Sequence, residues 1–171
     1  MPTKKEALAA ESFQGYIAKA DDTDVVKAIR RNTKEFRKLL KSIPAKKRGY
    51  AYAEGKWTIQ ELLQHIIDAE RVFVYRALTF SRRDTSVLPG FDENTWAANV
   101  NKTPRKWKDL VEEFKTLRAG TELFFESLTD EDLLFTGNAN NNPANALAMG
   151  YVTAGHAKHH IFIIKERYLK K

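Results

Sequence analysis

The chain has 171 residues, of which 43% are hydrophobic and 30% are charged, so it can bury the core of a single domain. It contains no cysteine, which excludes a disulfide framework, an iron–sulfur cluster and a thiol nucleophile supplied by the protein itself. The net charge is +7, and between Arg30 and Arg48 nine basic residues accompany a single acid, Glu35.

The first predicted helix covers about residues 23–43 and stops before Pro44. Its apolar residues repeat with helical spacing, and four basic residues share the opposite face: Arg30, Lys34, Lys38 and Lys41. A solvated outer face explains this basic stripe better than a nucleic-acid surface, because no aromatic side chain interleaves with it to stack on bases. We therefore expect no nucleic-acid partner.

The second predicted helix runs from Thr58 to about Phe80, after a loop at 46–56. Thr58 and Glu61 have the spacing of a capping box, in which each side chain satisfies a backbone N–H of the other residue. The apolar residues that follow keep the helical period, so the start and the length of this helix are both predicted by the sequence.

A long connection, 81–102, separates this helix from the third one, which is predicted from Thr103-Pro104 to about Ser127. A capping residue followed by proline is a typical helix start. A short helical turn is expected at 129–132.

The last predicted helix opens at Asn142-Pro143, after a polar loop at 137–142, and continues to about Tyr168. No segment alternates convincingly as a strand does. The sequence therefore predicts an all-α fold, a four-helix up-and-down bundle with one long crossover loop, as a single domain over 1–171 with its core at about 16–169.

Three of the four histidines lie within five residues of the last predicted helix. Residues four apart project from one helical face about 6 Å apart, so His156 and His160 can reach one ion. They share that face with apolar residues and therefore point into the bundle. His65 lies at the edge of the apolar face of the second helix, and the two faces are expected to converge.

Three buried imidazoles need partners for their donors and acceptors, and a divalent cation supplies one by taking a nitrogen from each ring. Three protein nitrogens with one open position are typical of catalytic zinc sites. We therefore predict that His65, His156 and His160 bind one divalent metal ion, zinc or nickel. The alternative is that the His-x-x-x-His pair consists of two unrelated surface histidines, and His159 could replace His160 as a ligand.

Three further side chains are candidates for supporting this site: His159, Asp68 and Asp92. Asp68 follows His65 by three residues and could fix its tautomer through a hydrogen bond, as could Glu61, although capping already explains Glu61. His159 and Asp92 are candidate bases for hydrolysis. Three aromatic residues could line a pocket, although core packing explains each as well: Phe91, Trp96 and Tyr151.

Three segments resemble the DinB-like superfamily (DinB/YfiT-like): Lys56–Arg71 continued by 75–78, Leu88–Asp92, and Gly155–His160 continued by 166–169. They occur in the family's order, and the resemblance spans about residues 16–169. It implies a four-helix bundle, often dimeric, with a metal held by one histidine of the second helix and a His-x-x-x-His pair of the last. These correspond to His65, His156 and His160.

The resemblance leaves the reaction open, because the superfamily includes metal-dependent hydrolases of the YfiT type and transferases or isomerases that use low-molecular-weight thiols. We expect a metal-dependent S-transferase that takes such a thiol as a second cofactor, because a dication favours thiolate over thiol. The alternatives are a metal-dependent hydrolase and a non-catalytic stress-response module that binds metal.

The partner expected for either enzyme is a small-molecule substrate. The resemblance to the DinB-like superfamily further implies that the protein forms a homodimer. The N-terminus lacks an apolar signal region, and the longest bulky apolar run, Ile161–Ile164, is too short to span a bilayer. We therefore expect a cytoplasmic protein with no membrane partner.

Overall fold

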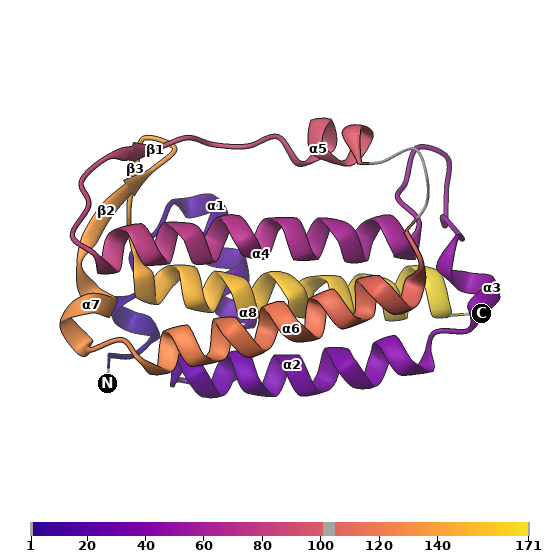
Figure 1. Cartoon of the computed structure of the whole chain (residues 1–171), viewed down its shortest axis with the longest axis horizontal. Coiled ribbons are helices and arrows are strands. Elements are labelled where there is room, and N and C mark those ends of the chain that lie inside the picture. The colour runs from indigo at the N-terminus through magenta and orange to yellow at the C-terminus, as the bar shows by residue number, and fades with distance from the viewer. Residues whose placement is uncertain (1, 101–104, 171) are drawn as a thin grey trace.

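The computed structural model describes residues 2–100 and 105–170. Long helices in these ranges form a bundle (Figure 1): α2 (Val25–Ser42), α4 (Ile59–Ser81), α6 (Trp107–Glu126) and α8 (Ala146–Ile163). The predicted four-helix bundle with one long crossover is confirmed. Among the described residues, no helix is both long and apolar enough to cross a membrane.

The crossover determines the directions of the helices. Between α4 and α6 the chain returns along the whole bundle, so these two helices start at the same end and run parallel (Figure 1). Helix α8 runs parallel to α2 and antiparallel to α4. It packs against both of them, and this arrangement brings residues of α4 and α8 face to face.

The predicted helix starts of α2 and α4 are close to those observed. In α4 the Thr58 backbone N–H donates to Glu61 Oε2 over 2.7 Å, and the Glu61 N–H donates to Thr58 Oγ1 over 3.2 Å. This is the predicted capping box. Helix α2 begins two residues later than predicted, because Asp24 caps it by accepting from the N–H of Lys27.

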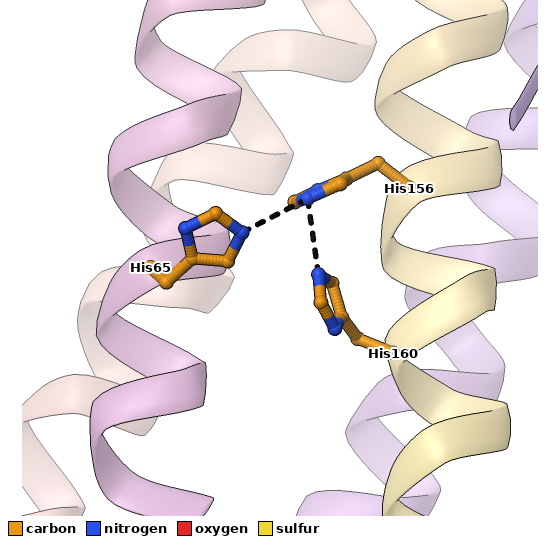
Figure 2. A group of neighbouring side chains, drawn as sticks. All are labelled: His65, His156 and His160. Atoms are coloured by element: carbon orange, nitrogen blue, oxygen red, sulfur yellow. Dashed lines mark hydrogen bonds between the residues drawn. The ribbon is translucent and has the colours of Figure 1, made fainter. Parts of the chain in front are cut away.

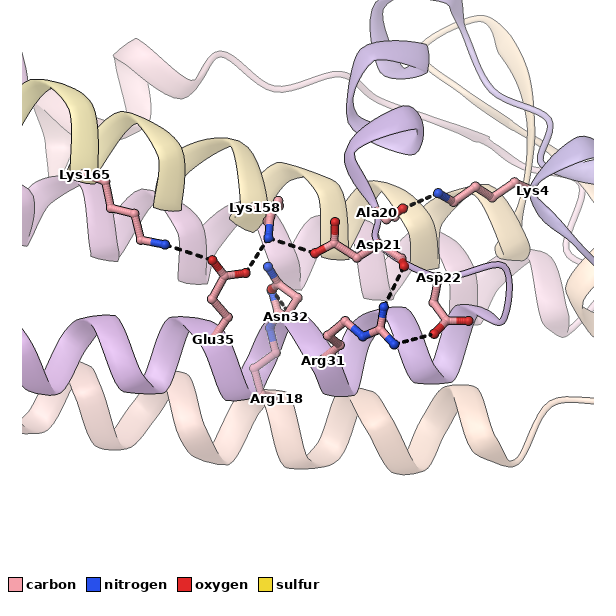
Figure 3. A network of polar contacts seen from close by, with 10 residues as sticks. All are labelled: Lys4, Ala20, Asp21, Asp22, Arg31, Asn32, Glu35, Arg118, Lys158 and Lys165. Atoms are coloured by element: carbon pink, nitrogen blue, oxygen red, sulfur yellow. Dashed lines mark hydrogen bonds and ion pairs between the residues drawn. The ribbon is translucent and has the colours of Figure 1, made fainter.

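The basic stripe of α2 faces solvent, as expected from its spacing. The acid Glu35 is turned the other way and accepts from Lys158 of α8 (2.5 Å) and from Lys165, just beyond the end of α8 (3.0 Å) (Figure 3). Lys158 also pairs with Asp21, just before α2, over 2.8 Å. These ion pairs link α8 to α2 along one side of the bundle.

The sequence prediction is wrong at the start of the last helix. Residues Asn142–Asn145 form strand β3, which pairs antiparallel with β2 (Thr136–Ala139), and β1 (Val87–Leu88) pairs parallel with β2. Asn140 and Asn141 turn the chain with φ of 54° and 59°, a conformation that Asn tolerates in tight hairpins. Helix α8 starts at Ala146, capped by Asn145, whose Oδ1 accepts from Ala148 N–H.

Other boundaries differ from the predictions in smaller ways. The predicted cap at Thr103-Pro104 lies outside the described residues, and α6 begins at Trp107. The expected turn after α6 is α7 (Asp130–Leu134), capped by Thr129. Beyond α8, the π-helical turn η2 (Ile164–Leu169) continues the helix, and two short helices interrupt the long loops: α3 (Ala45–Arg48) and α5 (Glu93–Asn99).

The sequence gives no prediction for the N-terminal segment, which forms η1 (Lys4–Glu6) and α1 (Glu11–Lys19). Helix α1 packs against α8, which is buried on every side from Ala146 to Ala157. Helix α8 is thus the centre of the molecule, and the histidines near its C-terminal end lie inside the protein.

Candidate metal centre

The three histidines predicted as ligands meet between α4 and α8 (Figure 2). His156 Nε2 lies 3.1 Å from His65 Nε2 and 3.0 Å from His160 Nε2. One nitrogen from each of the three rings lies within 4.8 Å of the other two. We call these three residues the histidine triad. His65 is 91 residues from His156 in the chain. The triad therefore exists only because α4 and α8 face each other in the folded protein.

Aromatic rings enclose the triad. Tyr16 and Phe73 stand edge-on to His156 at centroid distances of 5.2 and 5.5 Å, and Trp57 lies 4.8 Å from His65. His156 and His160 are 5% and 9% exposed, while His65 is half-buried. Helices α1, α4 and α8 and the loop before α4 therefore close an apolar shell around three imidazoles.

Burial keeps these imidazoles neutral. It lowers the pKa of His156 and of His160 well below 6.5, and the neighbouring histidines lower it further. Burial also lowers the pKa of His65, with a smaller opposing effect from the Glu93 carboxylate. Neutral imidazole is the form that binds metal ions.

The hydrogen-bonding capacity of the triad is not satisfied internally. A neutral ring nitrogen is either a donor or an acceptor, so His156 Nε2 cannot donate to one neighbour while accepting from the other. His160 Nδ1 is also buried, with no hydrogen-bond partner among the described residues. A divalent cation would satisfy all three Nε2 atoms. Zn–N bonds of about 2.0–2.1 Å place tetrahedral ligands about 3.3 Å apart, close to the 3.1 and 3.0 Å that separate His156 Nε2 from His65 Nε2 and His160 Nε2.

A cavity of about 370 Å³ opens onto all three histidines. Its walls are largely aromatic near the triad, where Tyr16, Trp57 and Phe73 line it. Two charged side chains also line it: Glu93 at the start of α5 and Arg76 of α4. We call this space the main cavity. Its size suits a small molecule.

A second cavity, of about 280 Å³, is also lined by His160. It shares Trp57 with the main cavity and is lined by His159, Lys56, Tyr52 and Tyr168, among others. The triad therefore borders two separate spaces, one containing a carboxylate and a guanidinium and the other an ammonium group.

The three supporting residues predicted from the sequence have different positions. His159 lies outside the triad, in contact with the Tyr16 ring at 5.7 Å, and lines the second cavity. Asp68 accepts from Gln64 over 2.9 Å and pairs with Arg71 at 3.6 Å, so its contacts lie on α4 itself. A small hollow beside α5 is lined by Asp68 together with His65.

Asp92 caps α5, where its Oδ1 accepts from Asn94 and Thr95 N–H, and these bonds lower its pKa. The next residue, Glu93, is the acid that lines the main cavity and affects the pKa of His65. Sequence reasoning missed Glu93. The Asp-x-x-Thr spacing that begins at Asp92 could have indicated Glu93, because it is typical of a helix N-cap. The carboxylate of a capping Asp accepts from backbone N–H groups, so the next acid in the chain is the better candidate for the cavity.

The three aromatic residues predicted as possible pocket walls also have different positions. Phe91 lines the main cavity. The Trp96 ring packs against the Phe91 ring at a centroid distance of 4.8 Å, and Trp96 lines the small hollow beside α5. Tyr151 is fully buried in the core, where its hydroxyl donates to the Thr23 carbonyl oxygen. Tyr16 and Trp57 were not foreseen as walls.

A buried ion pair lies behind the triad. Arg118 of α6 is 0% exposed, and its Nε donates to Glu70 Oε2 over 2.6 Å. The same guanidinium donates to Asn32 Oδ1 over 3.0 Å and to the Thr153 carbonyl oxygen over 3.3 Å. Figure 3 shows Arg118 and Asn32 beside the Lys158–Glu35 ion pair. This network connects all four long helices one turn before His156.

Comparisons with known proteins agree on the family and the fold. The family model described as the DinB superfamily matches residues 28–164. A relative from Oceanobacillus iheyensis, named "Putative metal-dependent hydrolase", is 29% identical over 120 residues, or 67% of this chain; the match spans 66% of the relative, slightly under two thirds.

A similar solved structure is that of YfiT from Bacillus subtilis, which its title describes as "a probable metal-dependent hydrolase with an unusual four-helix bundle topology". The two structures superpose with a TM-score of 0.68 and 16% sequence identity, over 94% of this chain and 88% of that one. At this identity the likeness shows the fold.

Proposed function

The chain belongs to the DinB superfamily, and we propose that it is a metal-dependent hydrolase of a small-molecule substrate, with its divalent ion held by His65, His156 and His160. The observation that carries this proposal is the convergence of three neutral Nε2 atoms at the wall of a cavity of about 370 Å³. The names of the relatives from O. iheyensis and B. subtilis support it. Zinc or nickel suits three imidazole ligands.

When bound, such an ion lowers the pKa of a water molecule towards ~7 and polarises a carbonyl oxygen. The residues of the chain supply the rest of the chemistry. Glu93 lines the same cavity and is close enough to influence both His65 and Tyr16, so its carboxylate accepts the proton of the attacking water. Aromatic side chains around the triad exclude bulk water.

Tyr16 is the proposed hydrogen-bond donor to the substrate. Burial raises the pKa of its phenol, and the Glu93 carboxylate raises it further, so the hydroxyl keeps its proton at neutral pH. The ring lines the main cavity next to His156. A fixed donor at this position would stabilise negative charge that develops on the substrate oxygen.

Thiol transfer is the second candidate, and the second cavity favours it. A transferase must hold two reactants beside one ion, and the two cavities meet at His160 and Trp57. Lys56 in the second cavity would attract an anionic thiol. Hydrolysis requires one cavity only, and the relatives are named as hydrolases, so hydrolysis is the primary proposal.

Metal analysis tests the proposed ligands. We expect one ion per chain in the purified protein, loss of this ion in His156→Ala, and full retention in the matched control His159→Ala, whose ring lies outside the triad. Equal metal content in the wild type and His156→Ala would refute the ligand assignment.

Turnover distinguishes the reactions. We expect metal-dependent cleavage of activated esters or amides without added thiol. A thiolate charge-transfer band in the cobalt-substituted protein, with no ester or amide cleavage, would instead support thiol transfer. A metal-loaded protein with neither property would support a non-catalytic metal-binding module.

A further inference from the structure

We propose that the substrate carries a carboxylate, and that the guanidinium of Arg76 binds it at the end of the main cavity remote from the histidine triad. This inference rests on the proposed function and names its substrate class. Four observations carry it: the arrangement of residues along α4, the burial of Arg76, its lack of an anionic partner, and the neutral polar groups that line the same cavity.

One face of α4 runs along the main cavity. His65, Ala69, Phe73 and Arg76 all line this cavity, and their spacing of four, four and three residues places them on one helical face. From His65 to Arg76 the helix rises about 16 Å. The triad and the guanidinium therefore occupy different ends of one continuous space, with the small side chain of Ala69 leaving room between them.

Arg76 is buried without an anionic partner. Its side chain belongs to a residue that is 3% exposed, and its Nη2 donates to the Pro89 carbonyl oxygen over 2.9 Å. No carboxylate in the described residues lies within 4.0 Å of its nitrogens. Burial lowers its pKa, and no neighbouring charge opposes this effect. A guanidinium has five N–H donors, so most of its capacity is left for a ligand.

The other buried arginine shows how this fold treats such a charge when its role is structural. Arg118 is held by the Glu70 carboxylate, the Asn32 amide and a backbone carbonyl oxygen. Burying a cation is costly unless it is paired with an anion and hydrogen-bonded. The different surroundings of Arg76 and Arg118 indicate that the anion for Arg76 comes from outside the protein.

Glu93 does not fill this role, although it lines the same cavity. Its charge raises the pKa of His65 and of Tyr16, at the triad end, whereas burial is what lowers the pKa of Arg76. The main cavity thus has its carboxylate beside the triad and its guanidinium at the other end. A ligand that fits this cavity has an uncharged reactive group at the triad end, beside the Glu93 carboxylate, and a carboxylate at the Arg76 end.

Neutral polar groups also line the main cavity. The side chains of Ser12, Asn140 and Asn142 line it, and Gly90, which follows the Pro89 carbonyl group that accepts from Arg76, allows the Asn140 amide to approach closely. A Cβ atom at residue 90 would lie 2.7 Å from Asn140 Oδ1. Arg76 is the one arginine or lysine among the residues that line this cavity, so a singly charged carboxylate balances it better than a doubly charged phosphate.

The main cavity also has an apolar wall. Phe13, Phe73 and Phe91 line it, and the Phe13 ring packs edge-on against that of Phe73 at a centroid distance of 5.9 Å. The substrate class that fits is an ester or amide whose acyl part is an apolar chain or ring that ends in a carboxylate.

Matched substrates test the proposal. p-Nitrophenyl esters of five-, six- and eight-carbon acyl chains would be compared, each chain ending either in a methyl group or in a carboxylate. We expect the wild type to prefer the carboxylate form of at least one chain length by about tenfold or more in kcat/KM. A preference of this size is what one hydrogen bond between charged groups typically contributes. Arg76→Gln should abolish this preference, mainly by raising KM for the charged ester.

Two variants control for structural damage. Arg76→Lys keeps the charge that Arg76→Gln removes and should retain part of the preference. Arg82→Gln makes the same change at an exposed position of the same helix end and should retain all of it. Circular dichroism and metal content would confirm that each variant is folded and loaded.

Binding to metal-free protein separates this inference from the proposed function. Calorimetric titration with monomethyl adipate should show binding that Arg76→Gln loses, whereas dimethyl adipate should bind at least tenfold more weakly. Such binding, together with no ester cleavage by the metal-loaded protein, would overturn the proposed hydrolase and support the carboxylate site. Cleavage with no preference for charged esters, together with unchanged binding in Arg76→Gln, would overturn the carboxylate site and leave the hydrolase standing.

Discussion

The backbone of Tyr16 in α1 lies directly against Gly155 in α8, where a Cβ atom would overlap the Tyr16 carbonyl oxygen. This contact allows α1 to approach α8 and places the Tyr16 ring 5.2 Å from that of His156. A segment near the N-terminus thereby completes the wall of the candidate metal centre.

Gly155→Ala should therefore lower the free energy of unfolding by about 1–3 kcal/mol, the usual cost of overpacking, because α1 must move away from α8. Urea denaturation measures this change. The matched control is Gly120→Ala in α6, where a Cβ has no neighbour within 4 Å. This control should raise stability by about 0.5–1 kcal/mol, since alanine favours helix over glycine. Equal effects of the two substitutions would contradict the close contact.

Glu93→Gln should reduce kcat for hydrolysis by about 100-fold, because the amide cannot accept a proton from water. Metal content should stay unchanged, since Glu93 is outside the triad. The control is Asp92→Asn, in which asparagine still caps α5. Steady-state kinetics would show normal activity in this control. A larger loss of activity in Asp92→Asn than in Glu93→Gln would assign the base to Asp92 instead.

Arg118→Met should lower the free energy of unfolding by about 3–5 kcal/mol, because it leaves the buried Glu70 carboxylate without its cation. The double variant Glu70→Met, Arg118→Met should be less destabilised than Arg118→Met alone. Removal of the exposed Arg30–Glu126 pair by Glu126→Gln should cost less than about 1 kcal/mol. Urea denaturation of all three variants checks this order, and a double variant as unstable as Arg118→Met would contradict it.

Alkaline pH should destabilise the protein through two buried tyrosines. Burial is the main cause that raises the pKa of Tyr151 and of Tyr168 to about 12, from 10.0 in an unfolded chain. The folded state therefore holds these protons more tightly. The resulting stability is complete below pH 10.0 and is lost as the pH rises from about 10 to 12.

Tyr168→Phe should make the decline above pH 10 less steep, because it removes one of these groups along with its hydrogen bond to the Trp57 carbonyl oxygen. Urea denaturation at several pH values between 9 and 12 measures the slope. The control Tyr75→Phe changes a residue that is 56% exposed and should leave the slope as it is in the wild type. A slope unaffected by Tyr168→Phe would refute the assignment.

Much of the site could be predicted from the sequence because it depends on local helical geometry. The spacing of His156 and His160 places both on one face, and the apolar residues around them place that face inside the bundle. Glu61 was expected as a cap and is one, since a capping box involves residues only three apart. The short strands were missed because β2 and β3 are polar and too brief to show a period of two.

The sequence by itself therefore determined the four long helices, their order and the inward orientation of His156 and His160, all of which follow from periodicity within one segment. Only the tertiary structure decided that Glu93 rather than Asp92 lines the main cavity, that α1 brings Tyr16 to the triad, and that Arg76 is buried without an anion while Arg118 has one. These features depend on contacts between residues far apart in the chain. Hydrophobic burial drives such contacts without regard to sequence separation, so the residue pattern within one segment does not predict them.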